Sequence, residues 1–242
     1  LGPTTDVIET DTAGRVLAAV GAYPPPVSTD YGSTWTQSGS PGGGETEAYA
    51  FTKITAGGNS GRIVAGGTAN GTAFGSYAYS DDDGATWLGH AVDISFSRVN
   101  ALYYEAANLR TWLGADDGTV WISTDDGVSF AATARAPENA TAIHDIVKAG
   151  SRIYVSATIT GAGGTSTAIF STTDGGSTWT EATNSGADQS THSTVYGLAV
   201  DGSGYVYGIP STSGQILKSD TAAGGTFSII TVSGLTNARS IY

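Results

Sequence analysis

Short apolar stretches alternate with turn residues along the whole chain, and the third repeat of this pattern is the clearest. Its apolar stretches at 99–104, 110–115, 119–124 and 128–133 are separated by turns rich in Asp, Asn and Gly. Stretches of this length, bounded by turn residues, are typical of β-strands. The pattern therefore predicts four short strands in this one repeat.

The rest of the chain follows the same pattern. First strands are expected at 6–8, 50–52, 145–147 and 197–199, and second strands at 15–18, 62–65, 152–155 and 205–207. The repeats span about 1–46, 47–95, 96–139, 140–190 and 191–234, and a surplus strand is expected at 235–242. Four short strands repeated around an axis form the blades of a β-propeller.

The sequence thus predicts an all-β fold, with a single β-propeller domain of four-stranded antiparallel blades over 1–242. Five blades are expected. A fragment of a larger propeller is the alternative, because the surplus strand at 235–242 has the pattern of the first strand of a sixth blade.

An eight-residue phrase marks each repeat. It reads S-T-D-Y-G-S-T-W at 28–35, S-D-D-D-G-A-T-W at 80–87, S-T-D-D-G-V-S-F at 123–130 and T-T-D-G-G-S-T-W at 172–179. A fifth copy at 219–227, S-D-T-A-A-G-G-T-F, is one residue longer and has its aspartate displaced. The closing aromatic residues are 52, 43, 49 and 48 positions apart, and such a period is the signature of a repeat fold.

The phrase resembles the Asp-box, the hairpin motif S-x-D-x-G-x-T-W/F of bacterial-neuraminidase-type repeats. Sialidases, xyloglucan-degrading glycosidases, sortilin-type receptor domains, photosystem assembly propellers and many phage structural proteins carry it. The resemblance covers all the repeats and implies a structural role at outer turns. The chemistry agrees, because the aspartate accepts backbone N–H bonds, the glycine tolerates positive φ and the aromatic ring packs on the hairpin. The residues assigned to this role are Asp30, Trp35, Asp82, Trp87, Asp125, Phe130, Asp174, Trp179 and Phe227.

Composition argues against several classes of partner. The 242 residues carry a formal net charge of −12 with only ten Lys and Arg, which disfavours nucleic acids and anionic membranes. No apolar stretch reaches membrane-spanning length, and no cysteine is present for a disulfide or a thiolate metal site. The chain begins at Leu1 without an initiator methionine, so we expect a processed product or a piece of a longer protein.

Arginine opens the second strand in four repeats, at positions 15, 62, 110 and 152, and Tyr205 takes its place in the fifth. The resemblance to sialidases invites a comparison with the three arginines that surround the substrate carboxylate in those enzymes. Those arginines differ in position from blade to blade, whereas these recur at one position. We therefore expect a structural role, such as a hydrogen bond to a neighbouring turn.

The sequence gives no catalytic or metal site. Glycoside hydrolysis generally needs two carboxylates flanking the scissile bond, and no spacing pairs the acidic residues expected on loops near a shared site. These residues are Glu45, Glu47, Asp93, Glu138, Glu181 and Asp188. The dispersed His90, His144 and His192 favour neither a catalytic triad nor a zinc site. The run 81–83 of three aspartates could attract Ca²⁺, although a solvated turn is the simpler interpretation. No metal or cofactor is therefore assigned.

Candidate ligand-binding residues lie where each first strand begins, which in a propeller lines the central channel. Alignment of these strands places Thr5, Tyr49, Asn100, His144, Tyr196 and Arg239 at equivalent positions. Because they differ in every repeat, they could form an asymmetric site on a symmetric scaffold, and aromatic, amide and imidazole groups suit a sugar. A wet channel mouth that tolerates any polar residue is the alternative. Long Gly- and Ser-rich loops are expected on the same face, at 37–46, 66–75, 161–167 and 181–192.

The first hypothesis is a non-catalytic binding or structural propeller, outside a cell or on a virion surface, that recognises surface glycan or packs against partner proteins. The phage setting comes from the resemblance alone. The alternative is a sialidase-like glycoside hydrolase or a fragment of one. A third interpretation, an assembly factor like the photosystem propellers, is disfavoured by the charge of −12, since those use a basic face.

Overall fold

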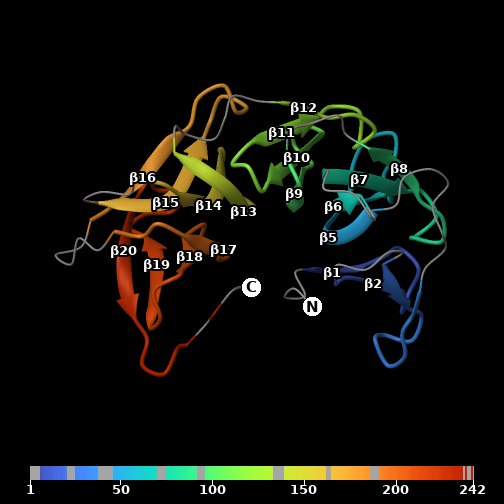
Figure 1. Ribbon diagram of the computed structural model, residues 1–242, viewed down its shortest axis with the longest axis horizontal. Helices are drawn as coiled ribbons and strands as arrows, with labels where there is room; N and C mark the ends of the chain where they lie inside the picture. The colour runs from blue at the N-terminus through green and yellow to red at the C-terminus, as the bar shows by residue number, and fades with distance from the viewer. Residues whose placement is uncertain are drawn as a thin grey trace. The chain divides into compact units, whose positions relative to one another are not determined.

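The computed structural model describes residues 6–20, 25–37, 46–69, 75–91, 96–132, 139–161, 165–185, 191–236, 238 and 241 (Figure 1). Within these residues the regular structure consists of β-strands, and no helix occurs. No helix long and apolar enough to cross a membrane is therefore found in the described part of the chain. The chain divides into two compact units, Leu1–Asp116 with Trp121–Ala131 and Asp117–Val120 with Ala132–Tyr242, and each is described by itself.

The first unit holds three four-stranded sheets, each with its strands in chain order (Figure 1). The third sheet extends by Val120 and Ala132 into the residues of the second unit. The first sheet comprises β1 (Asp6–Glu9), β2 (Val16–Ala19), β3 (Pro26–Ser28) and β4 (Thr36–Gln37), and the second comprises β5 (Thr46–Lys53), β6 (Ile63–Ala69), β7 (Gly75–Ser80) and β8 (Leu88–Ala91). The third comprises β9 (Val99–Glu105), β10 (Arg110–Ala115), β11 (Val120–Ser123) and β12 (Ala131–Ala132).

The second unit holds one eight-stranded sheet made of two antiparallel four-stranded halves. One half comprises β13 (Ala140–Ala149), β14 (Arg152–Ile159), β15 (Ser166–Thr172) and β16 (Thr180–Asn184). The other comprises β17 (Val195–Val200), β18 (Val206–Pro210), β19 (Gln215–Ser219) and β20 (Thr226–Thr231). A short parallel pairing of β16 with β20, at Thr183–Thr226 and Asn184–Phe227, joins the halves.

The strands agree with the four-strand pattern of each repeat, but all four expected loops are shorter than the sequence suggested. At 37–46 both end residues lie in strands, Gln37 in β4 and Thr46 in β5. The expected loop at 66–75 is wrong at its start, because β6 continues to Ala69. A Cβ at Gly66 would lie 2.4 Å from Val99 Cγ1, so this glycine lets β9 approach β6 closely. The loop at 161–167 likewise gives way to β15 at Ser166, and the loop at 181–192 begins only after β16 ends at Asn184.

The surplus strand expected at 235–242 falls mostly outside the described residues. Leu235, Thr236, Ala238 and Ile241 are described, and none of them lies in a strand.

The eight-residue phrases form the turns between the third and fourth strands, and we call them hairpins 1 to 5 (28–35, 80–87, 123–130, 172–179 and 219–227). In hairpin 2, the Ser80 hydroxyl donates to Asp82 Oδ1 at 2.8 Å and accepts the Gly84 N–H at 2.7 Å. Asp82 accepts the backbone N–H and the hydroxyl of Thr86 at 2.7 and 2.6 Å. The same hydrogen bonds recur around Asp30, Asp125 and Asp174.

These hydrogen bonds stabilise the ionised aspartates. Donation from the hydroxyl and N–H of Thr34 lowers the pKa of Asp30 to about 2, and donation from Thr178 does the same for Asp174. For Asp82, partial burial raises the pKa, but the hydrogen bonds from Thr86 and Ser80 outweigh it, so the pKa is below its usual value. The carboxylates therefore act within the turns, where they hold the hairpins together.

Hairpins 2 and 3 cover the sheet that precedes them in the chain. Arg15 Nε donates to the carbonyl oxygen of Asp83 at 2.6 Å, and Arg62 Nη1 donates to that of Asp126 at 3.2 Å. These are hydrogen bonds from a second-strand arginine to a neighbouring turn, as the recurrence predicts. In the second unit, hairpin 5 is covered in the same way, because Tyr154 Oη donates to the Gly224 carbonyl at 2.9 Å.

The acidic run 81–83 is engaged by protein groups. Arg62, which is buried, forms a bidentate pair with Asp81 at 2.7 and 3.0 Å, and its guanidinium lies 4.0 Å from the Tyr79 ring centroid. Asp82 holds its own hairpin, and the Asp83 carboxylate accepts the Thr12 hydroxyl. Among the described residues no group of three or more His, Asp or Glu could hold a metal ion. The arrangement favours a structural turn over a calcium site.

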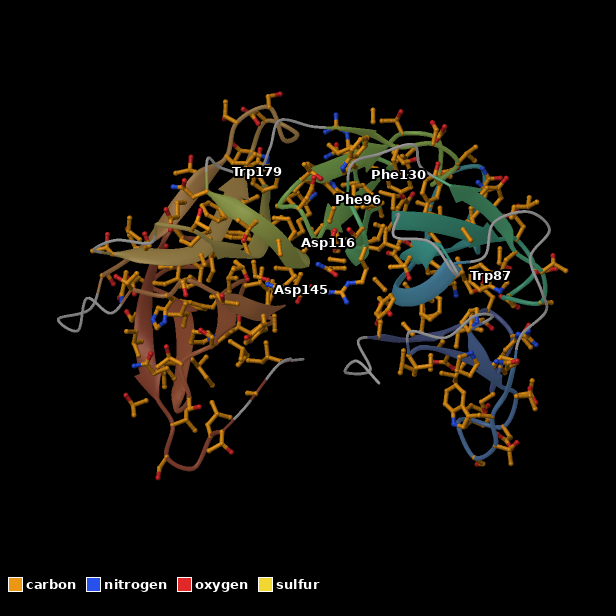
Figure 2. All side chains as sticks on the ribbon, in the orientation of Figure 1. Trp87, Phe96, Asp116, Phe130, Asp145 and Trp179 are labelled. Carbon is orange, nitrogen blue, oxygen red and sulfur yellow. The ribbon has the colours of Figure 1, made fainter. Side chains whose placement is uncertain are left out.

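Hairpin 1 differs from hairpins 2, 3 and 5, because no sheet of its own unit covers it among the described residues. A Cβ at Gly84 of hairpin 2 would meet Leu17 at 2.8 Å, whereas one at the equivalent Gly32 would meet only Trp35 of its own hairpin, at 3.6 Å. Trp35 is 43% exposed, while Trp87 is 2% exposed and stacks on Phe51 with ring centroids 6.2 Å apart (Figure 2).

Candidate functional site

Each of the described candidate ligand residues is the extra residue of a β-bulge. Tyr49 lies between Ala48 and Ala50, which pair with the consecutive Gly67 and Gly66. The same one-residue shift in register occurs in β9, β13 and β17, where the extra residues are Asn100, His144 and Tyr196. Thr5 and Arg239, the other two aligned positions, lie outside the described residues.

A bulge changes where its extra side chain points. The extra residue has no partner on the adjacent strand, and the strand bends locally, so that the side chain is redirected; such bulges are frequent next to active sites. Four of the five repeats carry the bulge at the same position and a different residue in it. The backbone therefore presents Tyr, Asn, His and Tyr in one repeated geometry.

In the first unit, Arg98 joins two of these residues. Its Nε donates to Asn100 Oδ1 at 2.6 Å, and its guanidinium carbon lies 5.0 Å from the centroid of the Tyr49 ring. The backbone before β9 is held by Asp116, whose Oδ1 accepts the N–H groups of Ser97 and Arg98 at 2.9 Å each (Figure 2). A cation, an amide and an aromatic ring thus lie together where β5 and β9 begin.

In the second unit, His144 and Tyr196 are in contact. Their rings are 5.5 Å apart between centroids and meet edge to face at 63°. His144 Nε2 is 2.8 Å from Thr158 Oγ1, which is 3.2 Å from Thr194 Oγ1. These hydrogen bonds fix the imidazole, so the two rings form a defined half-buried surface.

Sequence reasoning missed Arg98 and the carboxylates that support the bulges. Asp145, directly after His144, accepts the Ile146 N–H at Oδ1 and the Leu198 N–H at Oδ2, both at 2.8 Å (Figure 2). It thereby connects the first strands of adjacent four-stranded halves. Asp6 has the same place in β1, and its Oδ2 accepts the Phe51 N–H at 2.8 Å. The available signal was an aspartate directly before two apolar residues in both strands, Asp6-Val7-Ile8 and Asp145-Ile146-Val147.

Burial raises the pKa of Asp6 to about 6, more than the hydrogen bonds from the Phe51 and Val7 N–H groups lower it. Burial disfavours the ionised form of Asp6 in the folded chain. The contribution of protonated Asp6 to the free energy of unfolding is therefore fully present below about pH 4 and is lost as pH rises through 6. The shift corresponds to roughly 3 kcal/mol.

We expect Asp6→Asn to remove this loss. Urea unfolding of the wild type and the variant between pH 4 and 7 should show a smaller fall in unfolding free energy for the variant. Asp174→Asn is the control: with a folded-state pKa near 2, Asp174 is ionised in both the folded and the unfolded chain from pH 5 to 7, so that variant should lose nearly the same stability throughout this range. Parallel curves for the wild type and Asp6→Asn would contradict the assignment.

Most of the carboxylates that the sequence offers for catalysis lie outside the described residues. Glu45, Asp93, Glu138 and Asp188 lie outside the described residues, and of Glu47 only the backbone is described. The expectation that Glu181 lies on a loop is wrong: it lies in β16, where its backbone pairs with Phe170 and its Oε1 is buried with no hydrogen-bond partner among the described residues. It is therefore part of a sheet and is not displayed on a loop.

Comparison with known proteins supports the fold. No protein-family model and no characterised protein sequence matches the chain. The GH74 enzyme of Niastella koreensis matches with a TM-score of 0.69 at 20% identity, over 96% of this chain and 37% of that one. The GH74 xyloglucanase of Xanthomonas campestris matches with a TM-score of 0.66 at 16% identity, over 98% and 38%. YCF48 bound to D1 peptide matches with a TM-score of 0.61 at 15% identity, over 96% and 68%.

The likeness defines the class of the chain as an all-β protein of β-propeller fold. At 15–20% identity it shows the fold alone. The chain spans about a third of the length of the two GH74 enzymes.

Proposed function

We propose that this chain is a non-catalytic, carbohydrate-recognising propeller of the Asp-box type, with five blades in a single domain. The observation that carries the proposal is the β-bulge at the start of four first strands, which holds Tyr49 and Asn100 in the first unit, and His144 and Tyr196 in the second, in the same local backbone geometry. The hydrogen-bonded turns of hairpins 1 to 4 support the Asp-box part of the proposal. Packing against a partner protein is the other form of this binding role.

The side chains have roles that suit sugar recognition. Tyr49 and Tyr196 offer aromatic faces for the apolar side of a pyranose ring. Asn100 and His144 offer hydrogen-bonding groups, and Arg98 adds a cationic donor beside Asn100. Arg239 is proposed as a further contact on the basis of the alignment.

The setting we propose is the outside of a cell or the surface of a virion. The net charge of −12 supports partners other than nucleic acids and anionic membranes. Glycans displayed on surfaces, or neighbouring proteins of an assembly, meet this condition.

A labelled sample on a broad glycan array tests the proposal. We expect binding by the wild type, and loss of binding for His144→Ala and Tyr196→Ala, because the two rings contact each other. Tyr31→Ala is the matched control, since this tyrosine is 75% exposed and lies in hairpin 1. Failure of the wild type to bind any glycan would refute carbohydrate recognition, and equal loss with Tyr31→Ala would refute the site.

A glycoside hydrolase is the second candidate, favoured by the likeness to GH74 enzymes. The glycans that bind should be incubated with the chain and assayed for released reducing ends; we expect none. If hydrolysis occurs, the carboxylate pair should include one of Glu45, Glu47, Asp93, Glu138 and Asp188. Separate changes of these residues to the corresponding amides would then lower the rate by orders of magnitude at one position.

A further inference from the structure

The second unit contains a cavity of about 140 Å³ beside Tyr196. It lies between the end of β18, the turn at 211–214, the start of β19 and the segment after β20. Val195 at the start of β17 pairs with Pro210, and Gln215 pairs with Thr231, whereas hairpin 5 closes the opposite ends of β19 and β20 at Ser219–Phe227. The cavity is therefore at the bulge end of the sheet, away from the hairpin.

The turn that forms one wall is fixed by backbone hydrogen bonds. Ser211 N–H donates to the Thr194 carbonyl at 2.9 Å, and the Gly214 carbonyl accepts the Val232 N–H at 2.8 Å. The wall is thus held to both neighbouring strands before any ligand binds. Such pre-organisation reduces the entropy that binding would cost.

The lining combines three kinds of group. Most of the lining surface is polar, because the turn at 211–213 contributes three hydroxyl side chains, and Tyr196, Ile209 and Leu235 add only a small apolar part. Gln215 adds an amide whose Oε1 is enclosed by the protein and has no hydrogen-bond donor among the described residues. A buried acceptor without a donor is costly, so rotation of the Gln215 side chain toward the cavity would let a ligand O–H group satisfy it. No charged side chain is among the described residues that line the cavity.

We propose that this cavity binds one neutral pyranose ring. A cavity of about 150 Å³ accommodates benzene. The cavity here is of similar size but is partly open, so it can hold a pyranose ring whose outer hydroxyl groups stay in solvent. Hydroxyl and amide groups along the wall, with a small apolar part from Tyr196, Ile209 and Leu235, fit a ring that carries hydroxyl groups at its edge. The absence of a cation from the described lining, together with the charge of −12, disfavours sugars that carry a carboxylate.

This inference rests on the proposed carbohydrate recognition and makes it specific. With a neutral sugar, Arg98 and the proposed contact Arg239 would serve as hydrogen-bond donors to hydroxyl groups and not, as the arginines of sialidases do, as partners of a substrate carboxylate. The inference also extends the site, because Tyr196 contacts His144 and lines the cavity.

Saturation-transfer NMR tests the inference with methyl glucoside, galactoside, mannoside and xyloside, and with the methyl glycoside of N-acetylneuraminic acid. We expect at least one neutral pyranoside to bind and the acidic sugar not to bind. Gln215→Leu should weaken binding about tenfold, the equivalent of one hydrogen bond. Thr212→Ala, in the exposed part of the turn, is a milder second variant that should also weaken binding. Gln37→Leu, at an exposed glutamine of β4, is the matched control and should leave binding unchanged.

The outcomes separate the two proposals. Glycan binding that His144→Ala abolishes but that Gln215→Leu and Thr212→Ala leave unchanged would overturn the cavity inference alone. Binding of the sialoside as strong as that of the neutral sugars would overturn the neutral class. An array without any hit for the wild type would refute carbohydrate recognition itself. Thermal unfolding of each variant confirms that lost binding does not reflect a lost fold.

Discussion

Replacement of Trp87 by alanine is expected to lower the free energy of unfolding by about 3–5 kcal/mol. The indole of Trp87 is 2% exposed, stacks on Phe51 and belongs to a core cluster that includes Leu17 and Val27 of the first sheet. Its removal leaves a cavity between two sheets and also forfeits apolar burial. Urea or thermal unfolding of the purified chain measures the loss.

The same change at Trp35 is the matched control. Trp35 occupies the equivalent place in hairpin 1 but is 43% exposed, so we expect Trp35→Ala to cost about 1 kcal/mol or less. Trp87→Phe should recover most of the stability, because Trp87 Nε1 has no hydrogen-bond partner in the part of the chain that the structure describes and phenylalanine stands at the equivalent positions 130 and 227. Equal losses for Trp35→Ala and Trp87→Ala would contradict the difference in coverage.

The second large effect is expected at Gly118, in the turn between β10 and β11. Its φ is +82°, and a Cβ there would lie 2.1 Å from the carbonyl oxygen of Ala140. The neighbouring atoms belong to the backbone and cannot rotate away. Gly118→Ala should therefore combine the strain of a left-handed conformation with overpacking, a total of about 2–5 kcal/mol.

Gly161 provides the control for backbone strain. It has a φ of +69°, but nothing lies within 4 Å of a Cβ placed on it. Gly161→Ala should cost only the strain, about 1–2 kcal/mol. The difference between the two variants in chemical denaturation isolates the steric contribution of Ala140. A Gly118→Ala protein as stable as Gly161→Ala would show that the turn moves freely.

The repeat pattern predicted the strands well, because similar turn residues recur between the third and fourth strands of every repeat. The starts of β10 at Arg110 and β14 at Arg152 agree with the sequence-based prediction. The alignment of first strands also selected the residues that occupy the bulges. It could not reveal the bulges themselves, because a one-residue shift in register depends on the pairing with the second strand, which no local pattern records.

Other features were predicted wrongly or missed, because the same residue type occurs in different structural roles. The glycines at 66 and 67 suggested a loop, yet they lie in β6, and Gly66 makes room for Val99. Arg98 lies outside the periodic arginine positions, so the repeat pattern does not indicate it, although its distinct position is what brings it to Asn100. The sequence could not predict the cavity beside Tyr196, because the segment after β20 forms part of its wall, whereas the sequence pattern predicts a strand there.

The coverage of a sheet by the following hairpin has a consequence for synthesis on the ribosome. Hairpin 2 closes over the first sheet, and hairpin 3 over the second. The closing aromatics at 35, 87 and 130 are 52 and 43 residues apart. Synthesis adds roughly 5–20 residues per second, so Leu17 or Val64 stays uncovered for several seconds after its own sheet is complete. Chaperones that bind nascent apolar segments would meet this chain in these intervals, once for every repeat.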